Sequence, residues 1–475
     1  MKLFKLIKNY KCRVVGNANI EILGLYHKDT EVKNGGLFFC LRGTKVDGVE
    51  FLNSAIKNGA VAIVTEQEIP NLFKVTQIIV KNARDAMSML AAEFFGNPAS
   101  KLKIIGVTGT NGKTTITTMI TKVFEYVGRK VALIGTNGVF ICGKKFDSEM
   151  TTPDPIELHK YFSKMVKAKC EFVCMEVSAH ALDLFKLEGI KFDISVFTNL
   201  TEDHLDYFKT MENYFETKEK LFTLKYSKFA ILNIDDEYAK IIEKRINIPY
   251  ETYSINDKAS FFATNIECLE NKQKFYLNNS YELKINMAGS FNVSNAIAAI
   301  SVLKHFNIDI IDIKKAFENM PAIDGRFNLF LVNGVKVIID YAHTPDGLAN
   351  LLKASYELKK DKKLIVLFGC GGNRETQKRA KMGEISSKYA DFIIISSDNP
   401  RFESREKIAR DIEKGVTCSN YLVEIDRSLA IKKGFEIAKT GDVFVIAGKG
   451  AERYIDENGV KLPYSDYEEI EKFRR

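Results

Sequence analysis

Short apolar runs alternate with stretches of helical spacing along the middle of the chain. Apolar, β-branched runs occur at 104–107, 131–134, 172–177 and 194–197, and the stretch 114–127 has the spacing of an amphipathic helix. Strands that alternate with helices are typical of a parallel sheet covered by helices. The pattern therefore predicts an α/β domain in this part of the chain.

The two ends of the chain show strand-like runs of their own. Runs at 35–43 and 60–64 predict a small α/β domain before residue 100. Residues 97–100 contain a proline and small polar residues, which favour a linker. In the last third, apolar runs that precede helical or turn segments lie at 336–340, 364–368, 392–395 and 443–446. These runs predict a second, Rossmann-like sheet.

The length and composition agree with several folded domains. The chain has 475 residues, of which 45% are hydrophobic and 27% are charged. A chain of this length exceeds what one hydrophobic core usually supports. We therefore predict the fold class α/β, with three domains at residues 1–100, 101–324 and 325–475.

The charge and cysteine content narrow the function classes. The net charge of +8 comes from 69 basic and 61 acidic residues in short mixed runs. This mixture argues against nucleic-acid binding and favours a basic cleft for a polyanionic small substrate. The eight cysteines lack the spacing of a zinc site or a disulfide framework, and no apolar run is long enough for a membrane span. We expect a cytoplasmic, monomeric protein with reduced thiols and no membrane insertion.

A glycine-containing loop lies between the strand at 103–107 and the helix at 114–127. Backbone N–H groups of such a loop, the helix N-terminus and a lysine together bind phosphate. The usual pattern has a glycine where Val107 stands, so this loop is a compact variant. The predicted nucleotide-binding residues are Gly109, Thr110, Asn111, Gly112, Lys113, Thr114 and Thr115. The alternative is a chance Gly-Lys-Thr, against which the order of strand, loop and helix argues.

Two side chains suited to binding a metal follow predicted strands of the same domain. Glu176 ends the run 172–177, and His204 lies just beyond the run 194–197. Carboxylate and imidazole groups at strand ends can hold magnesium in a nucleotide site. Taken singly, each residue could be a solvated polar residue in a turn. Two of them in one nucleotide domain favour a metal site.

Four segments of the chain resemble the Mur ligases. These segments are 109–115, 176–180, 198–207 and 340–346. The resemblance runs over nearly the whole chain and is weakest in the first domain. It implies an N-terminal domain that binds the UDP end of a substrate, a central ATPase domain and a Rossmann-like C-terminal domain that binds an amino acid.

The resemblance implies ATP-dependent formation of an amide bond. ATP would phosphorylate the D-glutamate γ-carboxylate of UDP-N-acetylmuramoyl-L-alanyl-D-glutamate, because a carboxylate is a poor electrophile until its oxygen becomes a good leaving group. The amine of a diamino acid would then attack the acyl phosphate. Lys113 would spread the charge of the transferred phosphoryl group.

The resemblance also implies how Mg²⁺ is bound. Thr114 and Glu176 would hold one ion and His204 a second. A lysine in the following helix, Lys218 rather than Lys220, would be carbamylated, which converts an ammonium into an anionic oxygen ligand. Without the resemblance, either lysine is an ordinary solvated helix residue.

Further contacts are carried over residue by residue. Residues expected to face the nucleotide are Asn292, Asn295, Arg326 and His343. Residues expected to bind the sugar-peptide substrate are Thr44, Lys45, Val46, Thr151, Thr152, Ser178 and Lys186. Residues expected to bind the incoming amino acid are Arg374, Asp398, Asn399, Pro400, Arg401, Gly448 and Glu452. Asn292 has a plain alternative as a helix cap.

The Asp-Asn-Pro-Arg segment at 398–401 bears on the choice of amino acid. In the family this motif marks enzymes that take meso-diaminopimelate, whereas lysine-adding members lack the arginine. A guanidinium can bind the distal carboxylate of a diamino diacid with two hydrogen bonds, and Glu452 could pair with its distal ammonium. Meso-lanthionine has the same end groups and stays an alternative.

The chain departs from the family pattern at two places, one in the first domain and one in the central domain. Residues 28–30 are Lys-Asp-Thr where the family usually has Asp-Ser-Arg near the uridine, and Lys186 stands where an arginine is common. Lysine keeps the charge and loses the planar fork of donors. Substrate contacts at these positions are therefore expected to differ from those of other members.

Two other functions compete with this interpretation. Folylpolyglutamate synthetase shares the loop and the acyl-phosphate chemistry, and segments 151–153 and 398–401 argue against it. A phosphate-loop ATPase that performs no ligation would not need Arg374, Arg401 and Glu452 on a further sheet, and it would hydrolyse ATP without an amino acid.

Overall fold

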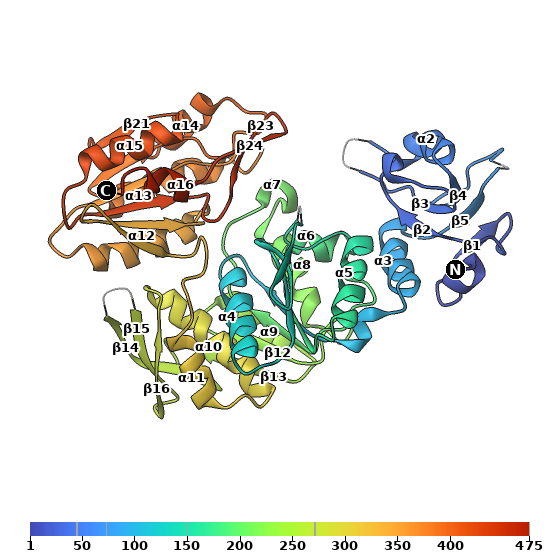
Figure 1. Cartoon of the computed structure of the whole chain (residues 1–475), viewed down its shortest axis with the longest axis horizontal. Coiled ribbons are helices and arrows are strands. Elements are labelled where there is room, and N and C mark those ends of the chain that lie inside the picture. The colour runs from blue at the N-terminus through green and yellow to red at the C-terminus, as the bar shows by residue number, and fades with distance from the viewer. Residues whose placement is uncertain (44–45, 73, 149, 270–271, 475) are drawn as a thin grey trace. The chain divides into compact units, whose positions relative to one another are not determined.

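A computed structural model of the chain describes residues 1–43, 46–72, 74–148, 150–269 and 272–474. The chain, drawn in Figure 1, divides by its internal packing into two compact units. The first comprises Met1–Thr108, Gly128–Ser195 and Lys220–Phe229, and the second comprises Gly109–Val127, Val196–Glu219 and Ala230–Arg475. The three domain boundaries expected from the sequence stay predictions.

The first unit begins with a five-stranded sheet. Its strands, in spatial order, are β1 (Arg13–Val15), β5 (Thr76–Ile79), β4 (Ala60–Thr65), β3 (Gly36–Phe39) and β2 (Gly24–Tyr26). Only β1 is antiparallel to its neighbour. Leu37 and Phe39 pack in the core beneath α1 (Leu3–Leu6) and α3 (Ala83–Phe94), while Phe38 packs in the core beneath α2 (Leu52–Lys57). This alternation is the two-residue period of a strand.

The rest of the first unit contains the strand that precedes the phosphate loop. In spatial order the strands are β6 (Lys103–Thr108), β10 (Phe172–Glu176), β7 (Val131–Gly135), β8 (Gly138–Ile141) and β9 (Lys144–Phe146). The first three are parallel, as predicted, and β8 and β9 extend the sheet antiparallel. Helix α5 (Pro155–Lys167) packs against α3, and α6 (Ala179–Asp183) follows β10. The expected linker at 97–100 instead begins a 3₁₀ turn at Pro98–Lys101.

The second unit contains the helix after the loop and a further set of strands. Its first helices are α4 (Lys113–Tyr126), α7 (Leu205–Phe208), α8 (Met211–Glu219), α9 (Glu237–Arg245), α10 (Ser290–His305) and α11 (Ile310–Glu318). Its first strands are β12 (Ala230–Asn233), β13 (Tyr250–Ser254), β14 (Phe261–Leu269), β15 (Lys272–Leu277) and β16 (Tyr281–Ile285). Strand β11 (Ile194–Phe197) has residues in both units. The sequence did not predict β14 to β16, because their apolar residues alternate with polar ones.

The last part of the second unit is a six-stranded, mostly parallel sheet. Its strands, in spatial order, are β17 (Asn328–Val332), β18 (Val335–Asp340), β22 (Val443–Ala447), β19 (Leu364–Phe368), β20 (Phe392–Ile395) and β21 (Tyr421–Val423). Only β17 is antiparallel to its neighbour. The hairpin of β23 (Tyr454–Glu457) and β24 (Val460–Pro463) follows β22 along the chain. The Rossmann-like sheet predicted for this part of the chain is confirmed.

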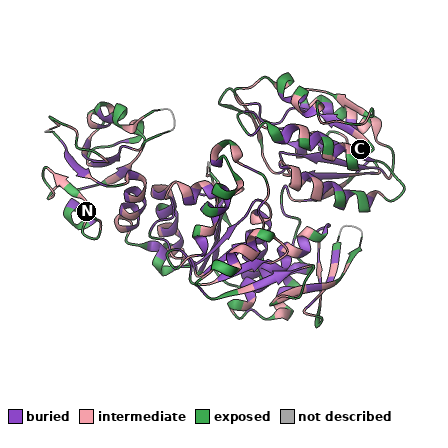
Figure 2. Ribbon diagram, turned by 180° about the vertical axis from the view of Figure 1, so that it is seen from behind, coloured by how far each residue is buried: buried purple, intermediate pink, exposed green. Residues whose placement is uncertain are grey.

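Helices cover both faces of this sheet. One core packs beneath α12 (Pro345–Lys359), α13 (Gln377–Tyr389) and α14 (Arg405–Glu413), and the other beneath α15 (Arg427–Ile437) and α16 (Asp466–Glu471). Figure 2 shows the strands largely buried and the helices with exposed outer faces. Because β22 lies between β18 and β19, the segments after β18, β19, β20 and β22 meet at one edge, where ligands bind in open α/β sheets.

No helix in the described part of the chain is long and apolar enough to cross a bilayer.

Burial of His159 in α5 predicts a pH-dependent loss of stability. The side chain is fully buried beside Phe162, and neither ring nitrogen has a hydrogen-bond partner within the described chain. Burial lowers the pKa of His159 from 6.5 to about 4. Between these values the unfolded chain binds a proton that the folded chain does not. The free energy of unfolding should therefore fall by about 3 kcal/mol as the pH drops through this window.

Urea unfolding followed by circular dichroism at several pH values checks this expectation. His159→Leu should remove the corresponding slope, because the apolar side chain takes up no proton in the unfolded state. His305→Leu, at an exposed histidine, should leave the slope as it is. Equal slopes for the parent and His159→Leu would contradict the prediction.

Candidate active site

The phosphate loop joins the end of β6 to the start of α4. Gly109 and Gly112 have φ angles of 147° and 90°, which only glycine adopts readily. A Cβ atom at Gly109 would overlap the Thr198 hydroxyl, and one at Gly112 would lie 2.5 Å from Asn295 Oδ1. The loop therefore passes close to the segment after β11 and to α10. Its backbone N–H groups lead directly into a helix N-terminus, which is the arrangement that binds phosphate.

The other loop residues are held from the segment after β11. Thr110 Oγ1 donates to the Thr201 carbonyl at 3.2 Å, and Asn111 N donates to Asn199 Oδ1 at 2.9 Å. Thr114 and Thr115 lie in the first turn of α4 and are buried. All seven predicted loop residues thus belong to one closely held turn.

Two lysine side chains reach the loop. Lys113 Nζ donates to the carbonyls of Gly109 and Thr110, both at 2.8 Å. Lys218 Nζ, from α8, donates to the Gly109 carbonyl at 3.0 Å. The two ammonium positions therefore lie over the same turn, where a phosphate group would require positive charge.

Lys218 has an unusual environment for a lysine. It is 1% exposed, and its Nζ lies 4.7 Å from the centre of the Tyr214 ring. Burial and the charge of Lys113 hold the pKa of Lys218 well below its usual value, although Asp203 opposes the shift. Lys220, the other candidate for carbamylation, is exposed. The neutral amine needed for reaction with carbon dioxide is therefore favoured at Lys218.

Asp203 and His204 lie side by side at the start of α7. His204 has a φ of 58°, which is uncommon for a residue other than glycine, and its Nε2 lies 3.4 Å from Asp203 Oδ2. Lys378 Nζ lies 3.9 Å from the other oxygen of Asp203. Burial alone would raise the pKa of Asp203, but His204 and Lys378 lower it below its usual value. Asp203 is therefore ionised and can orient the imidazole.

Side chains from the last third of the chain contact the loop within the second unit. Arg326 Nη2 donates to Thr114 Oγ1 at 2.8 Å. Asn111 Nδ2 donates to Asp346 Oδ2 at 2.9 Å. The predicted nucleotide residue Arg326 is thus brought to the loop, whereas the sequence had given no reason to assign Asp346.

The remaining predicted nucleotide residues lie on α10 and after β18. Asn295 Nδ2 donates to Asn292 Oδ1 at 3.2 Å, and Asn292 Nδ2 donates to the Ala288 carbonyl at 2.7 Å. His343 Nδ1 lies 2.8 Å from the Tyr341 carbonyl. Burial, followed by nearby positive charge, lowers the pKa of His343, so its ring is neutral at pH 7.

Glu176 ends β10 in the first unit. It pairs with Val107 of β6, just before the loop begins. Its buried carboxylate accepts hydrogen bonds from Thr136 N at 2.9 Å and Thr136 Oγ1 at 3.1 Å. A carboxylate accepts at several lone-pair sites, so these hydrogen bonds are compatible with a role as a metal ligand.

Four predicted sugar-peptide residues lie in the same unit as Glu176, and three of them lie close to it. Thr152 Oγ1 donates to the Glu176 carbonyl at 2.9 Å, and Ser178 N donates to Thr152 Oγ1 at 3.2 Å. Thr151 Oγ1 lies 3.2 Å from Thr136 Oγ1.

Lys186, the fourth of these residues, is buried, and its Nζ lies 2.8 Å from Asp154 Oδ1. Asp154 Oδ2 also lies 3.6 Å from His27 Nε2. An acidic partner thus holds the lysine that replaces the usual arginine.

Part of the predicted first-domain site cannot be placed. Thr44 and Lys45 lie outside the described residues. Val46 is exposed, and its carbonyl accepts a hydrogen bond from Gly43 N. Lys28 of the divergent segment pairs with Glu31 at 3.3 Å.

The donor groups predicted for magnesium are spread over several elements. Among the described residues, no group of three or more His, Cys, Asp or Glu side chains is arranged to hold a metal. Magnesium in nucleotide sites is usually bound by one or two carboxylates together with phosphate oxygens and water. Oxygen donors such as the Thr114 hydroxyl and the Glu176 carboxylate are of the kind that magnesium takes in such sites.

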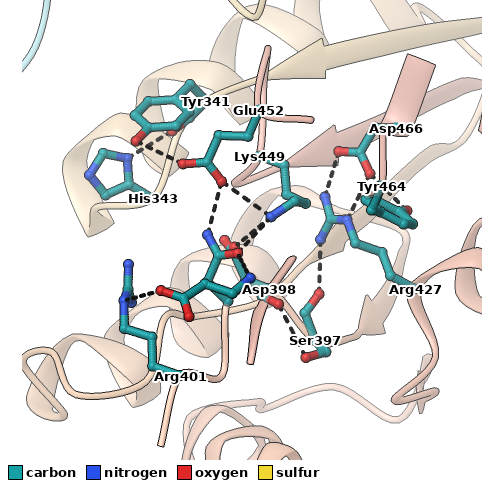
Figure 3. A network of polar contacts seen from close by, with 12 residues as sticks. Tyr341, His343, Ser397, Asp398, Arg401, Arg427, Lys449, Glu452, Tyr464 and Asp466 are labelled. Atoms are coloured by element: carbon teal, nitrogen blue, oxygen red, sulfur yellow. Dashed lines mark hydrogen bonds and ion pairs between the residues drawn. The ribbon is translucent and has the colours of Figure 1, made fainter. Parts of the chain in front are cut away.

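A buried polar network occupies the edge where the C-terminal strands end (Figure 3). Lys449 Nζ lies 3.0 Å from Asn399 Oδ1, 3.2 Å from Glu452 Oε2 and 3.5 Å from Asp398 Oδ1. Asn399 Nδ2 donates to Glu452 Oε2 at 2.9 Å. Gly448 has a φ of 112°, and a Cβ atom there would lie 2.8 Å from Asp398 Oδ2. The structure therefore brings four predicted amino-acid contacts together.

The predicted arginines lie beside the same edge. A Cβ atom at Gly371 would lie 2.7 Å from Arg401 Nη1 and 3.7 Å from Arg374 Cγ. Arg401 Nη1 donates to the Gly372 carbonyl at 2.9 Å, and a Cβ atom at Gly372 would overlap the Pro400 carbonyl. The glycines after β19 thus let this loop pack directly against residues 398–401.

The charges of this network are strongly coupled. Burial would raise the pKa of Asp398, but Lys449 and Arg427 lower it below its usual value. Burial and the charge of Asp398 raise the pKa of Glu452. The sequence alone assigned no role to Lys449 or Arg427. A lysine between two glycines after a strand has the pattern of a solvated turn, and only its position inside the segment 448–452 could have drawn attention to it.

The fold and these two groups of residues define a class of protein. A phosphate loop lies at the end of a parallel strand, and a second sheet presents buried acidic and basic groups at its ligand edge. This combination is typical of a nucleotide-dependent enzyme.

Comparison with known proteins narrows the class. The Mur ligase family catalytic domain matches residues 21–95, the Mur ligase middle domain residues 107–303, and the Mur ligase glutamate ligase domain residues 325–450. UDP-N-acetylmuramoyl-L-alanyl-D-glutamate--2,6-diaminopimelate ligase 1 of Clostridium acetobutylicum is 41% identical over 480 residues, which cover 100% of this chain and 99% of the relative. The corresponding ligase of Clostridium tetani is 41% identical over 464 residues, covering 96% and 95%.

A solved structure of a UDP-N-acetylmuramoyl-L-alanyl-D-glutamate--2,6-diaminopimelate ligase is similar over the whole chain. It has a TM-score of 0.70 and 29% identity, and the match covers 99% of this chain and 98% of the other. The chain therefore belongs to the Mur ligase family, has its three-domain α/β fold and is a ligase.

Proposed function

We propose that this ligase adds a diamino diacid, meso-diaminopimelate in the first instance, to the D-glutamate γ-carboxylate of UDP-N-acetylmuramoyl-L-alanyl-D-glutamate. ATP would supply the phosphoryl group that turns the carboxylate into an acyl phosphate, in the synthesis of peptidoglycan precursors. The observation that carries the proposal is the set of charged groups around residues 398–401, because it offers separate partners for an ammonium and a carboxylate. The names of the full-length relatives support the same substrates.

The chain's own residues fit the steps of this reaction. Lys113 lies over the loop, where its charge would stabilise a transferred phosphoryl group. Arg326 contacts Thr114 in the first turn of α4 and would add a second positive charge on the nucleotide side. Thr114, Glu176, His204 and Lys218 stay the predicted ligands of magnesium. The cytoplasmic location and monomeric state also stay predictions.

Phosphate release tests the proposed reaction. The assay combines ATP and magnesium with or without UDP-N-acetylmuramoyl-L-alanyl-D-glutamate, against meso-diaminopimelate, meso-lanthionine, lysine and ornithine. We expect release to require both the UDP substrate and an amino acid, with kcat/KM for lysine about 100-fold or more below that for meso-diaminopimelate, because lysine leaves the carboxylate partner unpaired. Phosphate release that does not depend on the UDP substrate would contradict the proposed function. A folate acceptor in place of the UDP substrate is the control for the folylpolyglutamate alternative.

Arg401→Ala tests recognition of the distal carboxylate. Losing the guanidinium should reduce kcat/KM for meso-diaminopimelate by a factor that corresponds to roughly 2 to 4 kcal/mol of transition-state free energy. The kcat/KM for lysine should stay nearly unchanged. Arg453→Ala is the matched control, because the Arg453 side chain is exposed and pairs with the exposed Glu468. Since Arg401 also bonds the Gly372 carbonyl, Arg401→Lys serves as a second variant that keeps the charge. An unchanged preference for meso-diaminopimelate over lysine in Arg401→Ala would refute the assignment.

Carbamylation of Lys218 is tested with ¹³C-labelled bicarbonate. The neutral amine would attack carbon dioxide, lose a proton and become an anionic carbamate, so the parent protein should show a carbamate carbon signal. Lys218→Ala should lack the signal and lose activity about tenfold or more, with partial rescue by a short carboxylic acid. Lys220→Ala, at the exposed neighbour, should keep both signal and activity. Full activity of Lys218→Ala would contradict a catalytic role for a carbamylated Lys218.

A further inference from the structure

Lys449 is a fully buried lysine at the edge of the C-terminal sheet where the segments after β18, β19, β20 and β22 meet. It lies between Gly448 and Gly450, whose φ angles are 112° and 50°, directly after β22. Its side chain is 0% exposed. Lysine is almost never fully buried unless its charge is paired, so the surrounding groups must compensate the cost of removing the ammonium from water.

Three oxygen atoms from two different segments surround this ammonium. Asn399 Oδ1, Glu452 Oε2 and Asp398 Oδ1 lie 3.0, 3.2 and 3.5 Å from Lys449 Nζ. Figure 3 shows Lys449 among these contacts, with Asp398 and Glu452 labelled. An ammonium has three N–H donors, so these contacts can use all of them. Lys449 therefore has no donor left for a ligand, and any effect on a substrate must pass through its partners.

Lys449 fixes the orientation of Asn399. The amide oxygen of Asn399 accepts from Lys449 Nζ and from Asp456 N, the latter at 2.9 Å. With its oxygen held on that side, the Asn399 amide nitrogen donates to Glu452 Oε2 at 2.9 Å. Glu452 Oε2 thus receives two donors, while Glu452 Oε1 lies 3.4 Å from the Tyr341 hydroxyl. The direction of the Glu452 carboxylate follows from the position of the lysine.

Lys449 also sets the charge balance around Glu452. The charged and titratable groups that face Glu452 are Lys449, Asp398, Tyr341 and Tyr454. Lys449 is shared between Asp398 and Glu452, and Arg427 and Arg401 add positive charge on the side of Asp398. Because Glu452 shares its lysine with a second carboxylate, it can still pair with an incoming ammonium. Without the lysine, two buried carboxylates would face each other, and one of them would take up a proton.

We propose that Lys449 is a positioning residue that determines specificity for the ammonium end of the incoming amino acid. It does so by holding Glu452 in place and ionised, through its contacts with Asn399 and Asp398. The inference rests on the proposed function, because it assumes that Glu452 receives a substrate ammonium. It goes further in assigning the recognition to a residue that does not touch the substrate.

The test is steady-state kinetics of the full-length chain with Lys449→Met and Lys449→Gln. Both variants should raise KM for meso-diaminopimelate about tenfold or more, with KM for ATP and for the UDP substrate within about twofold of the parent. Lys449→Gln keeps hydrogen-bond donors but has no charge, so it separates the effect of the charge from that of the hydrogen bonds. It also provides a second variant if Lys449→Met does not fold. Circular dichroism and thermal unfolding identify any variant that fails to fold.

The pH profile gives a readout that a purely structural role would not move. In Lys449→Met, the KM for meso-diaminopimelate should fall as the pH rises through the neutral range, because Glu452 recovers its charge, whereas the parent profile should be flat there. Lys461→Met is the matched control: Lys461 Nζ also lies over the Tyr454 ring, at 4.7 Å, but is exposed. It should behave as the parent does.

The outcomes separate the two hypotheses. If the parent releases phosphate without the UDP substrate, the proposed function fails. If the parent behaves as proposed but Lys449→Met and Lys449→Gln leave KM for meso-diaminopimelate and its pH profile unchanged, or raise all three KM values equally, the role of Lys449 is overturned while the proposed function stands.

Discussion

The edge at which the strands of the C-terminal sheet end depends on one interaction, a fully buried ion pair between Arg427 and Asp466. Arg427 Nε and Nη2 each lie 2.8 Å from an oxygen of Asp466, and the guanidinium also donates to the carbonyls of Ser397 and Ala447. These carbonyls directly precede Asp398 and Gly448. One side chain on α15 therefore ties the ends of β20 and β22 to α16. Removing either partner would leave a buried charge unpaired, which is among the costliest single changes in a protein.

The burial of a basic side chain also governs the phosphate loop, where Lys218 is 1% exposed. Lys218 lies beside Lys113 over one turn, and the two positive charges would repel each other if both were protonated. Burial resolves this by favouring the neutral form of Lys218. A lysine held neutral in this way is available for modification. The surroundings of Lys218 thus give it a chemistry that lysine does not have in water.

The sequence predicted the parts of this protein that depend on local pattern. The strand, loop and helix around Lys113 and the parallel C-terminal strands were found from apolar runs and glycine positions. The strands β14 to β16 were not predicted. Their apolar residues alternate with polar ones, which gives a weaker signal than the continuous apolar runs of the buried strands. The burial of Lys449 was also beyond the sequence. It results from β22 inserting between β18 and β19, so that residues 398–401 and 448–452 meet, and no local pattern encodes such a long-range neighbour.

Under the proposed function, charge balance would let this edge of the sheet select for both ends of a substrate. The carboxylates of Asp398 and Glu452 share the ammonium of Lys449, and Arg401 and Arg374 both lie beside Gly371. An amino acid with an ammonium and a carboxylate at its far end would neutralise both groups at once. One that lacks either group would leave a charge of the protein desolvated and unpaired. Selectivity would then come more from the cost of an unpaired protein charge than from the attraction between substrate and site. Polar sites reject analogues that lack a charged group in this way.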